Sequence, residues 1–158
     1  GLESTLTILG HRLREGRIAV ARNYDPALPR VWAAGGELNQ VWTELIDNAV
    51  DAIGGFAEDG GWIGVRTALE PGRVLVEVAD DGPGIPPDVL PRIWEPFFTT
   101  KGVGAGTGLG LDTVRRTVVE RHGGDVRVES RPGETRFQVR LPLSDRLATE
   151  ATTGSAGG

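Results

Sequence analysis

Asp80 opens the segment whose residue types point most directly to ligand chemistry, Asp-Asp-Gly-Pro-Gly-Ile at 80–85. It directly follows a predicted strand, so its carboxylate is expected at a fixed place near the edge of a sheet. A carboxylate held there can accept a hydrogen bond from an exocyclic amine such as N6 of adenine. Gly82 and Gly84 would let the backbone pass a flat ring without a Cβ in the way. Taken alone, the same residues also suit a tight turn.

A second glycine-rich run, GVGAGTGLGL at 102–111, leads into a predicted helix. The free N–H groups and the dipole at a helix N-terminus favour a phosphate. The run is not a P-loop, because no Gly-Lys-Ser/Thr closes it. It also lacks the preceding strand and βαβ unit of a dinucleotide fingerprint. On its own it is equally compatible with a flexible linker.

The element that these loops must flank is a helix predicted over Glu37–Ile53, whose apolar residues recur at helical spacing. Glu44, Asn48 and Asp51 stand at i, i+4 and i+7, so a helix places them along one edge of the apolar face. Such an edge is ordinary solvated surface in many helices. The two glycine-rich loops downstream favour a functional interpretation, since a purely structural helix would not need them.

Alternating apolar residues, turn residues and helical spacing predict the remaining elements. Strands are expected at 17–24, 62–69, 73–79, 125–130 and 135–141, and helices at 2–15, 37–53, 87–93 and 108–122. Two hairpins with helices between them predict an α+β fold, a two-layer α/β sandwich. Its sheet should be mixed, mostly antiparallel, and covered on one face by helices.

Composition narrows the class of protein. The 158 residues suit one domain, and a net charge of −5 without a basic run argues against a nucleic-acid partner. The absence of cysteine excludes disulfides and thiolate metal sites, and two histidines at unrelated positions argue against zinc. No apolar stretch reaches membrane-spanning length. A cytoplasmic location is therefore expected, although the parent protein could be membrane-anchored.

Four sequence pieces, taken together in this order and spacing, resemble the ATP-binding (Bergerat-type) domain shared by sensor histidine kinases, DNA gyrase B, Hsp90 and MutL. The resemblance spans residues 36–143. Asn48 lies in what resembles the N box, Asp80–Gly84 the first glycine box, Trp94–Lys101 the F box and Gly106–Gly110 the second glycine box. The F box and the closing GTGLGL are typical of the catalytic domain of bacterial sensor histidine kinases.

The resemblance implies a role for each matching residue. Asn48 should bind a Mg²⁺ that bridges the phosphates of ATP, Asp80 should bind adenine N6, and Ile85 should lie against the base. Residues 86–107 should form a lid, with Lys101 or Arg92 near the phosphates. The full nucleotide-binding set that is implied comprises Asn48, Asp51, Asp80, Gly82, Gly84, Ile85, Phe98, Thr100, Lys101, Gly106, Thr107, Gly108, Leu109 and Gly110.

Two departures from the family pattern matter. Glu44 stands where sensor kinases commonly have Asn and where gyrase-type ATPases have the Glu that activates water. It is therefore open as a Mg²⁺-shell residue, a general base or a solvated surface acid. The phosphoacceptor histidine is also missing, since His11 has no acid beside it and His122 is better placed to cap a helix C-terminus.

The resemblance thus predicts a catalytic domain at 16–143, preceded at 1–15 by the end of a dimerisation hairpin or a linker and followed at 144–158 by a disordered tail. ATP, the protein's own phosphoacceptor hairpin and a response regulator are the expected partners, and the isolated piece should be monomeric. Three alternatives stay open: a hydrolysing ATPase of the gyrase or MutL kind, an anti-sigma-factor serine kinase, and a non-catalytic nucleotide sensor.

Overall fold

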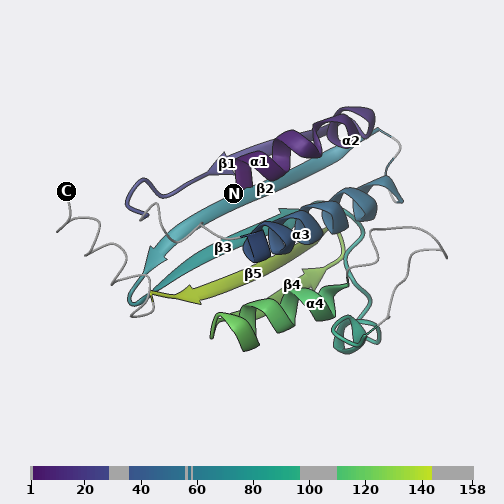
Figure 1. Cartoon of the computed structure of the whole chain (residues 1–158). Helices are drawn as coiled ribbons and strands as arrows, with labels where there is room; N and C mark the ends of the chain where they lie inside the picture. The colour runs from purple at the N-terminus through teal and green to yellow at the C-terminus, as the bar shows by residue number, and fades with distance from the viewer. Residues whose placement is uncertain (1, 29–35, 56, 58, 97–109, 144–158) are drawn as a thin grey trace.

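The computed structural model of the chain describes residues 2–28, 36–55, 57, 59–96 and 110–143 (Figure 1). Its strands are β1 (Ile18–Asn23), β2 (Gly61–Glu70), β3 (Arg73–Asp80), β4 (Asp125–Arg131) and β5 (Glu134–Pro142). Its helices are α1 (Leu2–Ile8), α2 (Gly10–Glu15), α3 (Gly36–Gly54), α4 (Leu111–Arg115), the 3₁₀ turn η2 (Leu90–Arg92) and the π-helical η3 (Arg116–Arg121), which continues α4. The predicted tail at 144–158 lies outside the described residues.

The five strands form one sheet in the order β1-β2-β3-β5-β4. β1 runs parallel to β2, and the other three pairs are antiparallel. The helices lie together on one face of this sheet (Figure 1), which confirms the predicted two-layer α+β sandwich. The second hairpin joins β3 through its second strand, β5. Asp80 is the last residue of β3, the central strand, and therefore lies where that strand ends, as the sequence predicted.

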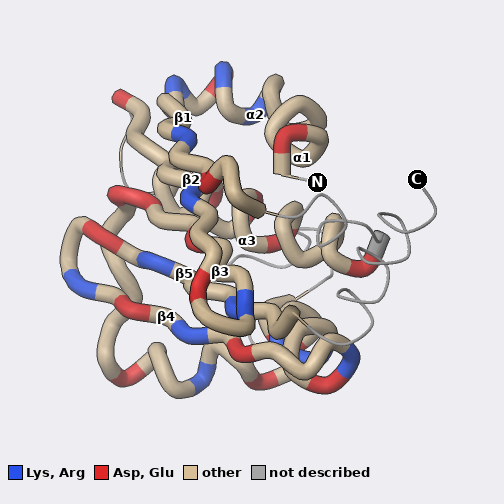
Figure 2. Tube along the Cα trace, turned by 90° about the vertical axis from the view of Figure 1, so that its left-hand side faces the viewer, with Lys and Arg blue, Asp and Glu red and all other residues tan. Residues whose placement is uncertain are grey.

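The strands of the sheet carry charged residues of both signs (Figure 2). Glu77 is the centre of this arrangement. Its carboxylate accepts a hydrogen bond from Gln138 at 2.9 Å and lies 3.5 Å from the guanidinium of Arg66. These neighbours hold the pKa of Glu77 below its usual value although burial opposes them.

The helical face buries the core, and α3 lies at its centre between the N-terminal helices and α4 (Figure 1). Trp42, Leu45 and Ile46 of α3 are fully buried. The predicted amphipathic helix at 37–53 thus extends by one residue at each end. On the side of α3 away from the N-terminal helices, Val114 of α4 and Val118 of η3 are buried, as their helical spacing predicted.

Residues 2–15 pack into the same core. Leu2, Leu6, Leu9 and Leu13 are buried there with the side chains of α3 and the sheet. Burying such apolar area is the main favourable term in folding. The two short helices therefore contribute to the stability of the domain. Their expected continuation into a dimerisation hairpin stays a prediction.

Candidate functional site

Asp80 is buried at the end of β3, with 2% of the residue exposed. Its Oδ1 accepts a hydrogen bond from the N–H of Gly82 at 2.9 Å. Burial raises the pKa of Asp80 to about 6, the hydrogen bond from Gly82 lowers it, and the nearby charge of Asp81 raises it. The ionised carboxylate is thus poorly solvated, and a hydrogen-bond donor on a ligand would stabilise it.

The loop after Asp80 is held by the β4–β5 hairpin. Gly84 has φ +86°, and a Cβ at this position would overlap the carbonyl oxygen of Arg131. The N–H of Ile85 donates to Ser130 Oγ at 2.7 Å. Glycine at 84 is therefore required both by its backbone conformation and by the close approach of the hairpin. These contacts hold in place the loop after Asp80, which the sequence predicted to pass a flat ring such as adenine.

The same loop also lies against α3. A Cβ at Gly82 would come within 3.3 Å of Ala52, one turn beyond Asn48 on that helix. Asn48 itself is half-buried. The structure thus brings the Asp80 loop and the last turns of the helix that carries Asn48 into contact, as the sequence interpretation required.

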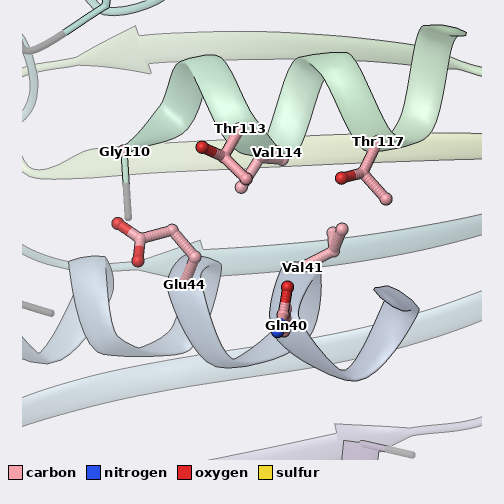
Figure 3. A pocket seen from close by; sticks show the side chains of 7 residues that line it. All are labelled: Gln40, Val41, Glu44, Gly110, Thr113, Val114 and Thr117. Carbon is pink, nitrogen blue, oxygen red and sulfur yellow. The ribbon is translucent and has the colours of Figure 1, made fainter. Parts of the chain in front are cut away.

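A hollow lies between α3 and α4, on the side of α3 where Glu44 stands (Figure 3). The carboxylate of Glu44 points toward Gly110, the residue before α4, and the Thr113 hydroxyl lies across from it (Figure 3). Only 6% of Glu44 is exposed, so its interpretation as a solvated surface acid is wrong. The hollow is lined by Gln40, Val41, Glu44, Gly110, Thr113, Val114 and Thr117.

Asp51, predicted to bind nucleotide, lies against a cation of the N-terminal helices. The guanidinium Nη2 of Arg12 donates to Asp51 Oδ1 at 2.5 Å, and Arg12 also pairs with Asp47. The side chain of Asp47 is 4% exposed. Its burial was not predicted, because an acid within an amphipathic helix gives no signal of a distant partner.

Several predicted residues lie outside the described part of the chain, namely Phe98, Thr100, Lys101, Gly106, Thr107, Gly108 and Leu109. Arg92 is described and lies on η2, where its guanidinium is 3.3 Å from Glu95. Trp94, at the start of the predicted F box, packs edge-on against Phe137 with ring centroids 6.1 Å apart. This contact anchors the beginning of that segment to the core.

Two hydroxyl residues near Asp80 were missed by the sequence interpretation. Thr135 is paired with Asp80 across β3 and β5 and is buried, and its Oγ1 lies 2.9 Å from Ser130 Oγ. Side chains directly opposite on antiparallel strands point to the same face. The register of the second hairpin could have indicated Thr135 only if β5 had been known to pair with β3.

The residues present fit a Mg²⁺ that is held jointly with phosphates. Within the described ranges, no group of three or more His, Asp or Glu side chains is arranged to hold a metal ion by itself. Asn48 and Glu44 nevertheless offer oxygen ligands one helical turn apart. Mg²⁺ prefers oxygen, and it is commonly bound by one or two protein groups together with waters and substrate phosphates.

The sequence profile of a protein family described as "Histidine kinase-, DNA gyrase B-, and HSP90-like ATPase" matches residues 34–145. The chain belongs to this family. The match covers α3, the Asp80 loop, α4 and the second hairpin, so the family prediction is confirmed for the part of the chain that forms the candidate site. An ATP-binding domain of this family therefore accounts for the geometry around Asp80 and α3.

Several relatives of this chain are named as histidine kinases. The sensory histidine kinase/phosphatase NtrB of Rhizobium meliloti (strain 1021) is 40% identical over 87% of this chain and 38% of its own length. The catalytic domain of histidine kinase ThkA is 28% identical, with a TM-score of 0.73 and 89% of both chains covered. Full-length ShkA in complex with AMPPNP is 34% identical over 89% of this chain and 29% of its own, with a TM-score of 0.73.

This chain spans 38% to 44% of the length of three NtrB relatives that it matches. The ATPase domain is thus the part that they share with it. None of the helices that the structure describes is long and apolar enough to cross a membrane.

Proposed function

We propose that this ATPase-family chain is the catalytic part of a two-component sensor histidine kinase, and that it binds Mg²⁺-ATP and donates the γ-phosphoryl group to a histidine on a separate segment. The observation that carries the proposal is the buried carboxylate of Asp80, held beside a glycine loop that lies against α3. The 40% identity to a sensory histidine kinase supports the kinase assignment over the other members of the family.

The proposed roles follow the chemistry of each residue. Asp80 accepts a hydrogen bond from adenine N6, and Ile85 packs against the base. Asn48 and Glu44 would hold Mg²⁺, which supplies charge neutralisation to the phosphates when bound. Gly110 directly precedes the helical run that begins at Leu111 and continues through η3, and its position suits a phosphate. The remaining predicted residues, at 98–109, would complete the phosphate site and the lid.

The reaction needs little covalent chemistry from the domain itself. An imidazole nitrogen of the acceptor histidine forms a bond to the γ-phosphorus, the bond from that phosphorus to the bridging oxygen breaks, and ADP leaves. Positioning and charge neutralisation supply most of the catalysis in such transfers. The domain therefore acts by orienting ATP, while the nucleophile comes from a dimerisation hairpin, and the phosphoryl group then passes to a response regulator.

The proposed kinase domain acts in the cytoplasm, where ATP is available, and has no nucleic-acid partner. On its own it is a monomer, because dimerisation belongs to the hairpin. Residues 1–15 connect the domain to that hairpin.

Glu44 supports a second candidate function, slow hydrolysis of ATP. A buried carboxylate that points into the hollow beside α4 is placed to orient water next to bound phosphates. Replacing Glu44 with Gln keeps the shape and removes the base. If Glu44 acts as a base, Glu44→Gln lowers hydrolysis while nucleotide affinity stays similar, and unchanged hydrolysis disproves the idea.

The test of the main proposal combines the chain with γ-labelled ATP and a separately produced phosphoacceptor hairpin of a sensor kinase. Label on the hairpin's histidine supports the kinase, and a hairpin with that histidine replaced is the control. Free phosphate alone would indicate an ATPase instead, and label on a serine a serine kinase. Binding of ATP with neither product would indicate a nucleotide sensor.

A further inference from the structure

The polar edge of α3 carries three carboxylates next to the proposed polyphosphate site. Glu44, Asp47 and Asp51 lie within two turns of the helix, on either side of Asn48. Two of these acids, Glu44 and Asp47, are buried. A bound triphosphate next to this edge would be repelled by each uncompensated carboxylate, and the repulsion is stronger where water is excluded.

Arg12 of α2 places a cation against this edge. Its guanidinium spans Asp47 and Asp51, which stand one turn apart on α3. A planar guanidinium with several donors suits two carboxylates at once, which a lysine ammonium does not. Arg12 thus neutralises the two acids on the side of Asn48 that faces the N-terminal helices.

The same contact ties α3 to helices that precede the family-matched residues 34–145. Arg12 lies in a helix whose Leu13 is buried, and α1, which precedes that helix, packs directly on α3. The guanidinium therefore links the backbone of the N-terminal helices to the segment 47–51, which contains Asn48. A shift of α2 would move or release the charge that balances this part of the helix.

We propose that Arg12 is a positioning residue of the nucleotide site. It lowers the negative potential around Asn48 and holds that turn of α3 in place, so that the polyphosphate of a nucleotide can bind there. The inference rests on the proposed nucleotide site, and it assigns to the N-terminal helices a part in polyphosphate binding that the predicted linker role did not include.

An electrostatic role of Arg12 and a merely structural one differ in which part of the nucleotide they affect. Loss of an electrostatic contribution weakens ATP, which carries the triphosphate, and leaves adenosine unchanged. A general loosening of the fold weakens both ligands equally. The discriminating quantity is therefore the ratio of ATP affinity to adenosine affinity, together with its dependence on salt.

The experiment measures binding of ATP and of adenosine by titration calorimetry to the wild-type chain, Arg12→Gln, Arg14→Gln and the double variant Arg12→Gln/Asp47→Asn. Arg14→Gln is the matched control, because it removes the same charge from an exposed position of the same helix. We expect Arg12→Gln to weaken ATP about tenfold at low salt, with adenosine unchanged within about twofold, as one uncompensated charge near the phosphates implies. The double variant removes a carboxylate with its partner and should recover most of the loss.

Equal losses for ATP and adenosine, or a loss no larger than that of Arg14→Gln, overturns the proposal. If Arg12→Gln does not fold, Arg12→Lys takes its place. It keeps the positive charge but cannot span both carboxylates, so ATP should bind up to about threefold more weakly with adenosine unchanged. Equal losses for the two ligands in Arg12→Lys then overturn the proposal, whereas wild-type ATP affinity supports a role of the charge itself. Absence of ATP binding in the wild-type chain would refute the proposed nucleotide site itself, which is a different result.

Discussion

Thr135 of β5 lies directly opposite Asp80 of β3, and the two side chains are buried on the same face of the sheet. The Thr135 hydroxyl lies 2.9 Å from that of Ser130, which in turn accepts the N–H of Ile85. The end of β3, the glycine loop after it and the β4–β5 hairpin are therefore one connected unit. The proposed adenine site depends on all three, and several of its properties can be tested separately.

The raised pKa of Asp80 predicts an unusual dependence of stability on pH. Because its pKa in the fold, about 6, is above the ordinary value of 3.8, the stabilising contribution of the neutral form is complete below about pH 4 and is lost as pH rises through about 6. In Asp80→Asn the side chain does not titrate, so this pH-dependent loss of stability is absent. We expect the unfolding free energy of the wild type to fall by about 2 kcal/mol relative to Asp80→Asn between pH 4 and pH 8.

Chemical denaturation of both proteins at several pH values measures the difference, and other titrating groups cancel in the comparison. Parallel stability curves would contradict the prediction. ATP binding should show the opposite sign, because the ionised carboxylate is the better acceptor for adenine N6. Affinity should fall up to about tenfold per pH unit below pH 6.

Replacing Gly84 with Ala should destabilise the protein by a steric clash in addition to the strain of a left-handed backbone conformation. Gly84 and Gly133 have nearly the same backbone conformation, with φ +86° and +88°, but a Cβ would strike Arg131 at Gly84 and meets nothing at Gly133. A left-handed conformation costs a non-glycine residue about 1 to 2 kcal/mol. Gly133→Ala should therefore lose about 1 kcal/mol of unfolding free energy, and Gly84→Ala about 3 kcal/mol or more together with ATP binding. Equal melting temperatures for the two variants would disprove the steric argument.

The sequence was sufficient for the features that depend on local pattern. Helical spacing located α3 to within one residue at each end, and turn residues located both hairpins. The order of motifs identified the family, since Asn48 and Asp80 stand at characteristic places relative to these elements. Such features depend on neighbours in the sequence, so the sequence alone can reveal them.

Features that depend on distant pairing were not predictable in the same way. Asp51 lies 39 residues from Arg12, and no residue type in either helix specifies their contact. The pairing of β5 with β3 makes β3, which ends at Asp80, the central strand, and nothing in the alternation of either strand determines this order. Glu44 could be solvated or buried on an amphipathic helix until α4 is known to cover it.

Leu6 predicts that the N-terminal helices are needed for the stability of the domain. It is 3% exposed, whereas Ile8 in the same helix is 76% exposed, so the two residues form a matched pair. Leu6→Ala should lower the unfolding free energy by about 3 kcal/mol through lost apolar burial and the cavity left behind. Ile8→Ala should change it by less than about 0.5 kcal/mol. Thermal or denaturant unfolding measures both, and a small effect of Leu6→Ala would indicate that residues 2–15 are dispensable.

Ser130 predicts a loss of nucleotide affinity from a residue outside the recognised family motifs. Its hydroxyl accepts the Ile85 N–H at 2.7 Å and lies beside Thr135, so Ser130→Ala leaves that part-buried N–H without its acceptor. The expected loss of stability is about 1 kcal/mol. Because the same hydrogen bond holds the loop proposed to contact adenine, ATP and adenosine should both bind about fivefold more weakly.

Ser130→Thr is the control for this prediction. It keeps the hydroxyl and suits a strand, so it should bind both ligands as the wild type does. Wild-type affinity in Ser130→Ala would mean that the hairpin does not position the loop, whereas a loss confined to ATP would assign the effect to the phosphates instead of the base.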